Sequence, residues 1–221
     1  MLQNYNPGRT MKAGKGKRMI VDGMTYAEII EVAKTDETAV LAELVRRAPV
    51  YERNIKTRRG RGPVYFKPFE IERPTGITWY ARFFTNGYAD YKRGGLSFLL
   101  YGRFYFNGYL WVIWTYGRPF DYALFTYHFF DRYRQRYLSE NDRDTVEVIH
   151  EYFRYNSLGA NKTPRDGGIY CTTAQGAALG IVENGTQVYK TFITPELMRE
   201  EQQRAREQGL TIINEYNTTS K

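Results

Sequence analysis

The sequence has 221 residues, of which 42% are hydrophobic and 16% aromatic, and it carries a formal net charge of +8 at pH 7. Its twenty tyrosines and thirteen phenylalanines can build a core, which excludes a wholly disordered chain. The single cysteine, Cys171, excludes an internal disulfide framework and a cysteine-based zinc site. The positive charge favours anionic partners such as nucleic acid, an anionic membrane or an acidic protein, although plain solubility also explains it.

Residues 1–20 are expected to form a flexible basic arm, because cations alternate with glycine and asparagine, and residues 1–18 contain no acid. The residues expected to contact phosphate in this arm are Lys12, Lys15, Lys17 and Arg18. A solvated tail without a ligand is the alternative.

No stretch of the sequence predicts a membrane segment. The arm lacks the apolar core of a secretory signal, and the longest apolar stretch, residues 109–116, is too short to span a bilayer. We therefore expect no membrane partner. The expected location is the cytoplasm, which includes the cytoplasm of a host, or a virion.

Residues 21–210 are predicted to form one α+β domain, whose first part, residues 21–62, is helical. Apolar residues at helical spacing predict two short helices, Thr25–Ala33 and Thr35–Ala48. Thr35 or Asp36 would cap the second helix, and Pro49 would end it.

A second basic run follows these helices. It contains Arg58, Arg59 and Arg61, and the sequence Arg58-Arg59-Gly60-Arg61-Gly62 resembles the Arg/Gly segments that contact the RNA backbone. These three arginines are therefore candidate nucleic-acid-binding residues. An exposed loop without a ligand is the alternative.

Residues 63–125 are rich in β-branched and aromatic residues and predict a sheet. The expected strands are Val64–Glu72, Ile77–Tyr88, Leu96–Phe106, Tyr109–Tyr116 and Tyr122–Phe125. Pro68 places the first strand at an edge or a bulge, and Asn107-Gly108 predicts a type I′ hairpin turn. The predicted fold is α+β, with an antiparallel, aromatic-rich, twisted sheet and helices packed on one side of it.

Residues 126–210 alternate between helical and strand patterns. One helix is expected over Thr126–Leu138, and a second from Ser139, with Asp142 in capping-box-like spacing, to about Tyr155. Three strands follow, Ile169–Thr173, Ala178–Val182 and Gln187–Ile193, with a hairpin turn at Asn184-Gly185. A last helix, Glu196–Gln208, would be closed by Gly209 and followed by a polar tail, residues 211–221.

The helix expected over Thr126–Leu138 carries the residues with the clearest chemical use. At about 100° per residue, His128, Arg132 and Arg136 lie on one face, and Phe130, Tyr133 and Tyr137 lie on roughly the opposite face. Arginines can hold phosphate with paired donors, and an imidazole can exchange a proton near neutral pH. A solvated or salt-bridged face, with Asp131 and Glu140 as partners, is the alternative.

The run His128-x-x-x-Arg132-x-x-x-Arg136, after a short strand, resembles small bacterial toxin-like domains of the barnase/EndoU/colicin/RelE ribonuclease superfamily. In those domains a later β-hairpin ends in a Thr flanked by apolar residues, and here Thr191 ends a comparable hairpin. The resemblance covers about residues 125–194. It implies a metal-independent endoribonuclease, with His128 as acid/base, Arg132 and Arg136 as phosphate clamps, Thr191 as a hydrogen-bonding group and Lys190 as a further contact.

Two other interpretations remain open. A phage or mobile-element protein that assembles with other proteins, or a module that stacks single-stranded bases on tyrosines without cutting them, would have a similar composition. RNA is favoured over DNA as the partner. The sequence predicts no cofactor and no metal site, and Cys171, in a strand-like segment, is better explained by packing than by nucleophilic chemistry.

Overall fold

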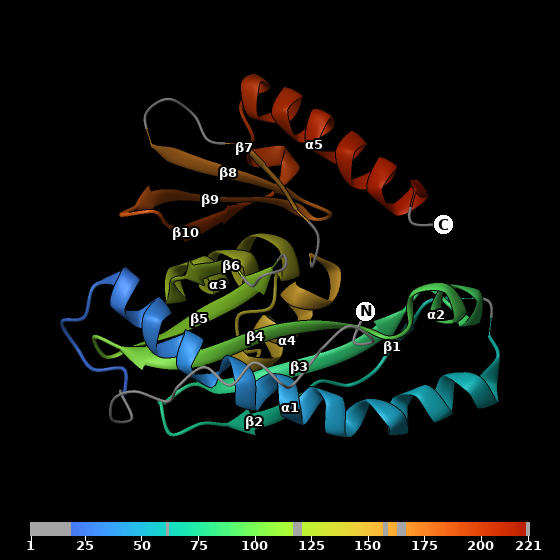
Figure 1. Ribbon diagram of the computed structural model, residues 1–221. Helices are drawn as coiled ribbons and strands as arrows, with labels where there is room; N and C mark the ends of the chain where they lie inside the picture. The colour runs from blue at the N-terminus through green and yellow to red at the C-terminus, as the bar shows by residue number, and fades with distance from the viewer. Residues whose placement is uncertain (1–18, 61, 117–120, 157–158, 163–166, 220–221) are drawn as a thin grey trace. The chain divides into compact units, whose positions relative to one another are not determined.

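The computed structural model describes residues 19–60, 62–116, 121–156, 159–162 and 167–219. The chain divides into two compact units, residues 1–107 and 108–221. Figure 1 labels the helices and strands of both units. Helices, mostly antiparallel strands and clusters of aromatic side chains confirm the predicted α+β class.

The first unit is built on a long helix and a small antiparallel sheet. Its elements are α1 (Tyr26–Arg58), β1 (Val64–Tyr65), β2 (Phe69–Glu72), β3 (Thr78–Thr85), α2 (Tyr88–Gly94) and β4 (Ser97–Phe106). β3 pairs with β4 on one side and with β1 and β2 on the other, always antiparallel. Pro68 separates β1 from β2 in the sequence, as expected for a residue that cannot donate to a ladder.

α1 is one continuous helix, so the prediction of two short helices ended by Pro49 is wrong. The helix begins with a capping box, in which Thr25 and Glu28 satisfy each other's backbone amides. Pro49 lies inside the helix, where it removes one hydrogen bond. Apolar contacts on both sides of it offset this loss, since Leu44 is fully buried before it and Tyr51 packs against Phe83 after it.

Asp36, expected as a helix cap, is instead a buried residue whose hydrogen bonds connect α1 to the sheet. Its side chain is only 2% exposed. The carboxylate accepts hydrogen bonds from Thr75 Oγ1 at 2.6 Å, Trp79 Nε1 at 3.0 Å and Arg73 Nε at 3.1 Å. Thr35 does not cap either, because its hydroxyl donates to the carbonyl of Val32 within the helix.

Among the described residues, the second unit contains a larger sheet, three α-helices, a short π-helix and a 3-10 helix. Its elements are β5 (Tyr109–Tyr116), β6 (Asp121–Phe125), α3 (Tyr127–Tyr133), the π-helix η1 (Arg134–Leu138), α4 (Thr145–Tyr155), β7 (Ala160–Lys162), β8 (Gly168–Thr173), β9 (Gly176–Glu183), β10 (Thr186–Ile193), the 3-10 helix η2 (Pro195–Leu197) and α5 (Glu200–Thr219). The strand order is β5-β6-β10-β9-β8-β7. The pair β6 and β10 is parallel, and the other neighbouring strands described in this unit are antiparallel. Phe125 lies in the core of this unit, where its ring contacts Phe129, Phe153 and Tyr189.

Both predicted Asn-Gly turns have the backbone that a type I′ turn needs. Asn107 and Gly108 have φ of +50° and +75°, and Asn184 and Gly185 have φ of +49° and +79°. The left-handed region is easiest for glycine and asparagine. These two local predictions are confirmed.

The last helix differs from its prediction at both ends. It begins at Glu200 rather than Glu196, and it passes through Gly209 to Thr219. Gly209 is the point of close contact between α5 and β8, because a Cβ there would lie 2.6 Å from Thr172 Cβ. The glycine therefore permits packing and does not end the helix.

Candidate functional site

α3 packs on β10, and this packing positions the predicted site residues on α3. Thr126 is the N-cap residue, as predicted, but its hydroxyl donates to the carbonyl of Lys190 at 3.4 Å and does not cap the helix. Its backbone amide donates to the carbonyl of Tyr189 at 3.0 Å. Phe129 and Tyr133 are buried on the underside of α3 and contact Phe192 of β10 edge to face.

The helix widens before it reaches Arg136. Residues 134–138 form a π-helix, so the regular four-residue spacing of a single α-helix does not hold there. Arg136 Nη1 donates to Phe192 O at 2.6 Å and to Thr191 Oγ1 at 3.4 Å. The structure thus brings Arg136 and Thr191 together. Tyr137, predicted on the core face, is 41% exposed and stacks on Tyr133.

Arg132 and Arg136 form a pair of like charges. Burial lowers the pKa of the half-buried Arg136, and the charge of Arg132 lowers it further. The exposed Arg132 donates from Nη1 to Gln135 Oε1 at 3.0 Å. In the described parts of the chain, no carboxylate pairs with Arg132, Arg136 or the exposed Lys190.

The acids that the sequence offered as partners are engaged elsewhere. Asp131 pairs with Arg134 at 2.7 Å, and Glu140 pairs with Arg143 at 3.4 Å. The salt-bridged form of the alternative interpretation therefore does not hold for Arg132 and Arg136, whereas a solvated face stays open.

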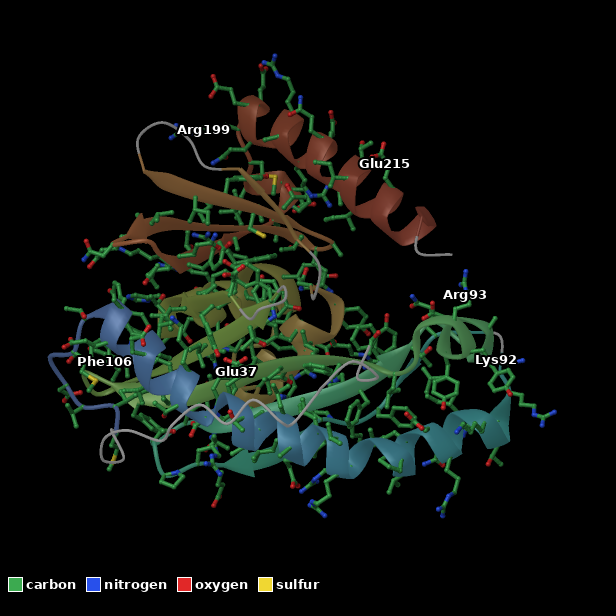
Figure 2. All side chains as sticks on the ribbon, in the orientation of Figure 1. Glu37, Lys92, Arg93, Phe106, Arg199 and Glu215 are labelled. Atoms are coloured by element: carbon green, nitrogen blue, oxygen red, sulfur yellow. The ribbon has the colours of Figure 1, made fainter. Side chains whose placement is uncertain are left out.

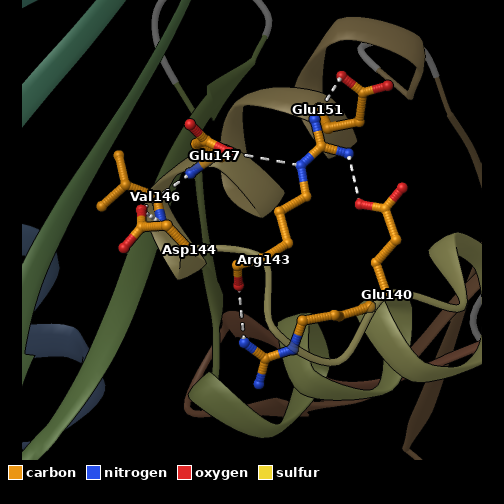
Figure 3. Close-up of polar contacts among 7 residues, drawn as sticks. Glu140, Arg143, Asp144, Val146, Glu147 and Glu151 are labelled. Atoms are coloured by element: carbon orange, nitrogen blue, oxygen red, sulfur yellow. Dashed lines mark hydrogen bonds and ion pairs between the residues drawn. The ribbon is translucent and has the colours of Figure 1, made fainter.

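Arg143 holds the loop between η1 and α4 (Figure 3). Its guanidinium contacts Glu140, Glu147 and Glu151 at 3.4–3.7 Å, and its carbonyl accepts from Arg134 Nη1 at 3.1 Å. This loop replaces the start of the helix predicted from Ser139. The N-cap is Asp144, whose carboxylate accepts from the amides of Val146 and Glu147.

His128 belongs to an exposed stack of three rings. It lies on Tyr127, with ring centroids 4.2 Å apart, and Tyr127 lies on Tyr109 of β5, also at 4.2 Å. Tyr127 Oη is 3.0 Å from His128 Nε2. Desolvation, and then the proximity of Tyr109, raise the pKa of Tyr127, so its hydroxyl stays protonated and can donate to the imidazole.

Neither tyrosine of this stack was predicted as a site residue from the sequence. Tyr127 adjoins His128, and Tyr109 directly follows the Asn107-Gly108 turn. Their aromatic type was visible, but their contact depends on how β5 and α3 meet. Stacked aromatic rings such as those of Tyr109, Tyr127 and His128 are suited to hold an unpaired base.

Lys190 is the extra residue of a β-bulge. Tyr189 is opposite Gly180 and Thr191 is opposite Leu179, which leaves Lys190 without a partner in β9. Among the other candidates, Arg58 and Arg59 are exposed at the end of α1 in the first unit. Lys12, Lys15, Lys17, Arg18 and Arg61 lie outside the described residues.

Cys171 is a poor nucleophile in this fold. Burial raises its pKa to about 12, and its side chain lies in the interior of the second unit. An unfolded thiol has a pKa of about 8.5. We therefore expect native protein at pH 8 to react with a thiol reagent at least about a hundredfold more slowly than protein in denaturant. Following the absorbance of a released chromophore measures both rates, and rapid stoichiometric labelling of the native protein would contradict the buried placement.

No family model matches this sequence, and neither the curated proteins nor the solved structures contain a match to it. None of the helices among the described residues has the length and apolar character needed to cross a membrane. The same residues include no cluster of three His, Cys, Asp or Glu side chains that could hold a metal ion.

Proposed function

We propose that this chain binds single-stranded RNA on the face formed by α3, η1 and β10. The observation that carries the proposal is that Arg132, Arg136 and Lys190 have no carboxylate partner among the described residues. Cations held close together without a counter-ion repel each other, and a bound phosphate relieves this repulsion. The hydrogen bond that Arg136 donates to Thr191 fixes one guanidinium at β10.

The three-ring stack supports unpaired RNA as the ligand. Tyr109 is 51% exposed, and His128 at the other end of the stack is exposed too. Aromatic faces stack on bases of any sequence, provided that the bases are not paired. A base on these rings would place its phosphate toward Arg132, one helical turn from His128.

We further propose that His128 makes this face a metal-independent endoribonuclease. The imidazole would take the proton of a 2′-hydroxyl, whose oxygen attacks the adjacent phosphorus. The bond between phosphorus and the 5′-oxygen breaks, the 5′-oxygen takes a proton from water, and a 2′,3′-cyclic phosphate is left on the other fragment. Arg132 and Arg136 would neutralise the charge that builds on the phosphate. The likeness of residues 125–194 to the barnase/EndoU/colicin/RelE domains supports the same roles, and a cytoplasm or a virion would supply the RNA.

Binding without cleavage is the second candidate. It is favoured by the contact between His128 Nε2 and the Tyr127 hydroxyl, which already occupies one ring nitrogen. In that case His128 would serve as part of the stacking platform. A structural role in a phage or mobile-element assembly would use the same surface.

Replacing Arg132 by glutamine tests the phosphate-binding face. We expect the dissociation constant for single-stranded RNA to rise about tenfold, because a charge-assisted hydrogen bond contributes roughly 1.5–3 kcal/mol. Fluorescence anisotropy with labelled RNA in EDTA measures this change. Arg204→Gln is the matched control, since Arg204 is 72% exposed on α5 and pairs with the exposed Glu200 at 3.6 Å. Equal affinities of the two variants would remove Arg132 from the interface, and a wild-type protein that ignores RNA would overturn the proposal.

A further inference from the structure

The first unit has its own basic surface, which the proposed site does not use. Residues 51–60 and 88–95 contain six basic and two acidic side chains. The basic side chains are all exposed: Arg53, Lys56, Arg58, Arg59, Lys92 and Arg93. Figure 2 shows Lys92 and Arg93 projecting outward from α2, beside the C-terminal end of α1.

Two of these cations have acidic partners among the described residues. Lys56 pairs with Glu52 at 3.8 Å, and Arg93 pairs with Asp90 at 3.7 Å. Within residues 19–60 and 62–107, no acid pairs with the remaining basic side chains, Arg53, Arg58, Arg59 and Lys92. The surface therefore keeps a positive charge that the first unit itself does not neutralise.

Two tyrosines lie among these cations. The rings of Tyr88 and Tyr91 stack with centroids 6.4 Å apart. Lys56 Nζ lies 5.7 Å from the Tyr91 ring, and Lys92 Nζ lies 5.8 Å from the Tyr88 ring. The amide of Tyr88 donates to the carbonyl of Gly60 at 3.0 Å, which holds α2 against the end of α1.

We propose that this end of α1 together with α2 is a second contact surface for single-stranded nucleic acid. Basic side chains that alternate with tyrosine rings are suited to a strand with a charged backbone and unpaired bases. Arg58, Arg59 and Lys92 bind phosphates, and Tyr88 and Tyr91 stack on bases. The surface lies wholly in the first unit, so it needs neither His128 nor any cleavage.

The charged part is tested with the triple variant Arg58→Gln, Arg59→Gln, Lys92→Gln in the full chain. The probe is a labelled oligothymidylate of about 20 nucleotides, longer than the site of a single binding domain. We expect its dissociation constant to rise about tenfold or more, and the slope of log K against log salt to fall by about 2, because each lost phosphate contact removes roughly 0.7. The triple variant Lys34→Gln, Arg46→Gln, Lys67→Gln, with the same loss of charge elsewhere on this unit, should bind as the wild type does. Equal thermal unfolding of all three proteins shows that the fold is retained.

The stacking part is tested with Tyr91→Leu against Tyr91→Phe. Leucine should weaken binding of the oligothymidylate about tenfold, whereas phenylalanine should not, because stacking needs only the ring. A duplex of the same length should bind more weakly than the single strand. Equal binding of single strand and duplex would overturn base stacking, and capture of phosphatidylserine vesicles in place of the oligonucleotide would overturn nucleic acid as the ligand.

The same probe separates this inference from the proposed function. Oligothymidylate has no 2′-hydroxyl, so its binding is measured whether or not the protein cleaves RNA. Unchanged affinity in the triple variant, with affinity lost in Arg132→Gln, would refute the second surface and keep the first. The reverse result would keep the second surface and refute the first.

Discussion

Replacing His128 by alanine is expected to lower the rate of RNA cleavage by about 10²- to 10⁴-fold, the usual contribution of a positioned acid or base. The dissociation constant for RNA should change much less, because Arg132, Arg136 and Lys190 keep their charges. The imidazole is exposed and its ring is held on Tyr127, so its removal leaves the core of the second unit intact. Single-turnover cleavage of labelled RNA in EDTA, with saturating protein, measures the rate separately from binding.

The control is Tyr127→Phe, which removes the hydroxyl 3.0 Å from His128 Nε2 but keeps the stacked ring. If the hydroxyl only orients the imidazole, the rate should fall about tenfold, much less than in His128→Ala. A His128→Ala protein that cleaves at the wild-type rate would exclude His128 from the chemistry. A wild type that binds RNA without cutting it would favour the binding-only candidate.

Local features of the fold could be predicted because the deciding interactions lie within a few residues. Asn107-Gly108 and Asn184-Gly185 specify positive φ by themselves, and both turns form. The β-branched and aromatic residues of Leu96–Phe106 likewise predicted a strand, and β4 forms there, over Ser97–Phe106. Secondary structure of this kind depends little on the rest of the chain.

Other elements could not be predicted because distant contacts decide them. α1 continues past Pro49 because the residues after the proline are packed: Ile55 is buried, and Tyr51 contacts Phe66 and Phe83. These contact partners lie outside the helix, so the sequence of α1 does not reveal them. α2 was not predicted, and only its first residue, Tyr88, was expected, as the end of the strand Ile77–Tyr88. Its attachment through Tyr88 to Gly60 is not visible in sequence periodicity. Gly209 was interpreted from its helix-ending tendency, whereas its contact with Thr172 determines its role.

The candidate site shows the same division. The arginine spacing predicted a basic face, and Arg136 does reach Thr191, 55 positions along the chain. The π-helix, the bulge at Lys190 and the stack of Tyr109 on Tyr127 depend on how α3 meets the sheet. The sequence therefore indicated the charged groups but not the stacked rings of Tyr109 and Tyr127, which support the proposal of an unpaired ligand.

Replacing Asp36 by alanine is expected to destabilise the first unit by about 3–5 kcal/mol, the cost of removing one partner of a buried, hydrogen-bonded charge pair. The change leaves Trp79 Nε1 and Thr75 Oγ1 without their acceptor and removes the ion pair with Arg73. Asp36→Asn, which keeps the shape and one acceptor oxygen, should cost less. Urea unfolding followed by tryptophan fluorescence measures both values. The control is Glu31→Ala, because Glu31 is 61% exposed and forms a surface pair with Lys34. Such surface pairs contribute about 0–1 kcal/mol. A loss below about 1 kcal/mol in Asp36→Ala would mean that water or the remaining groups satisfy the donors, and that the carboxylate does not tie α1 to the sheet.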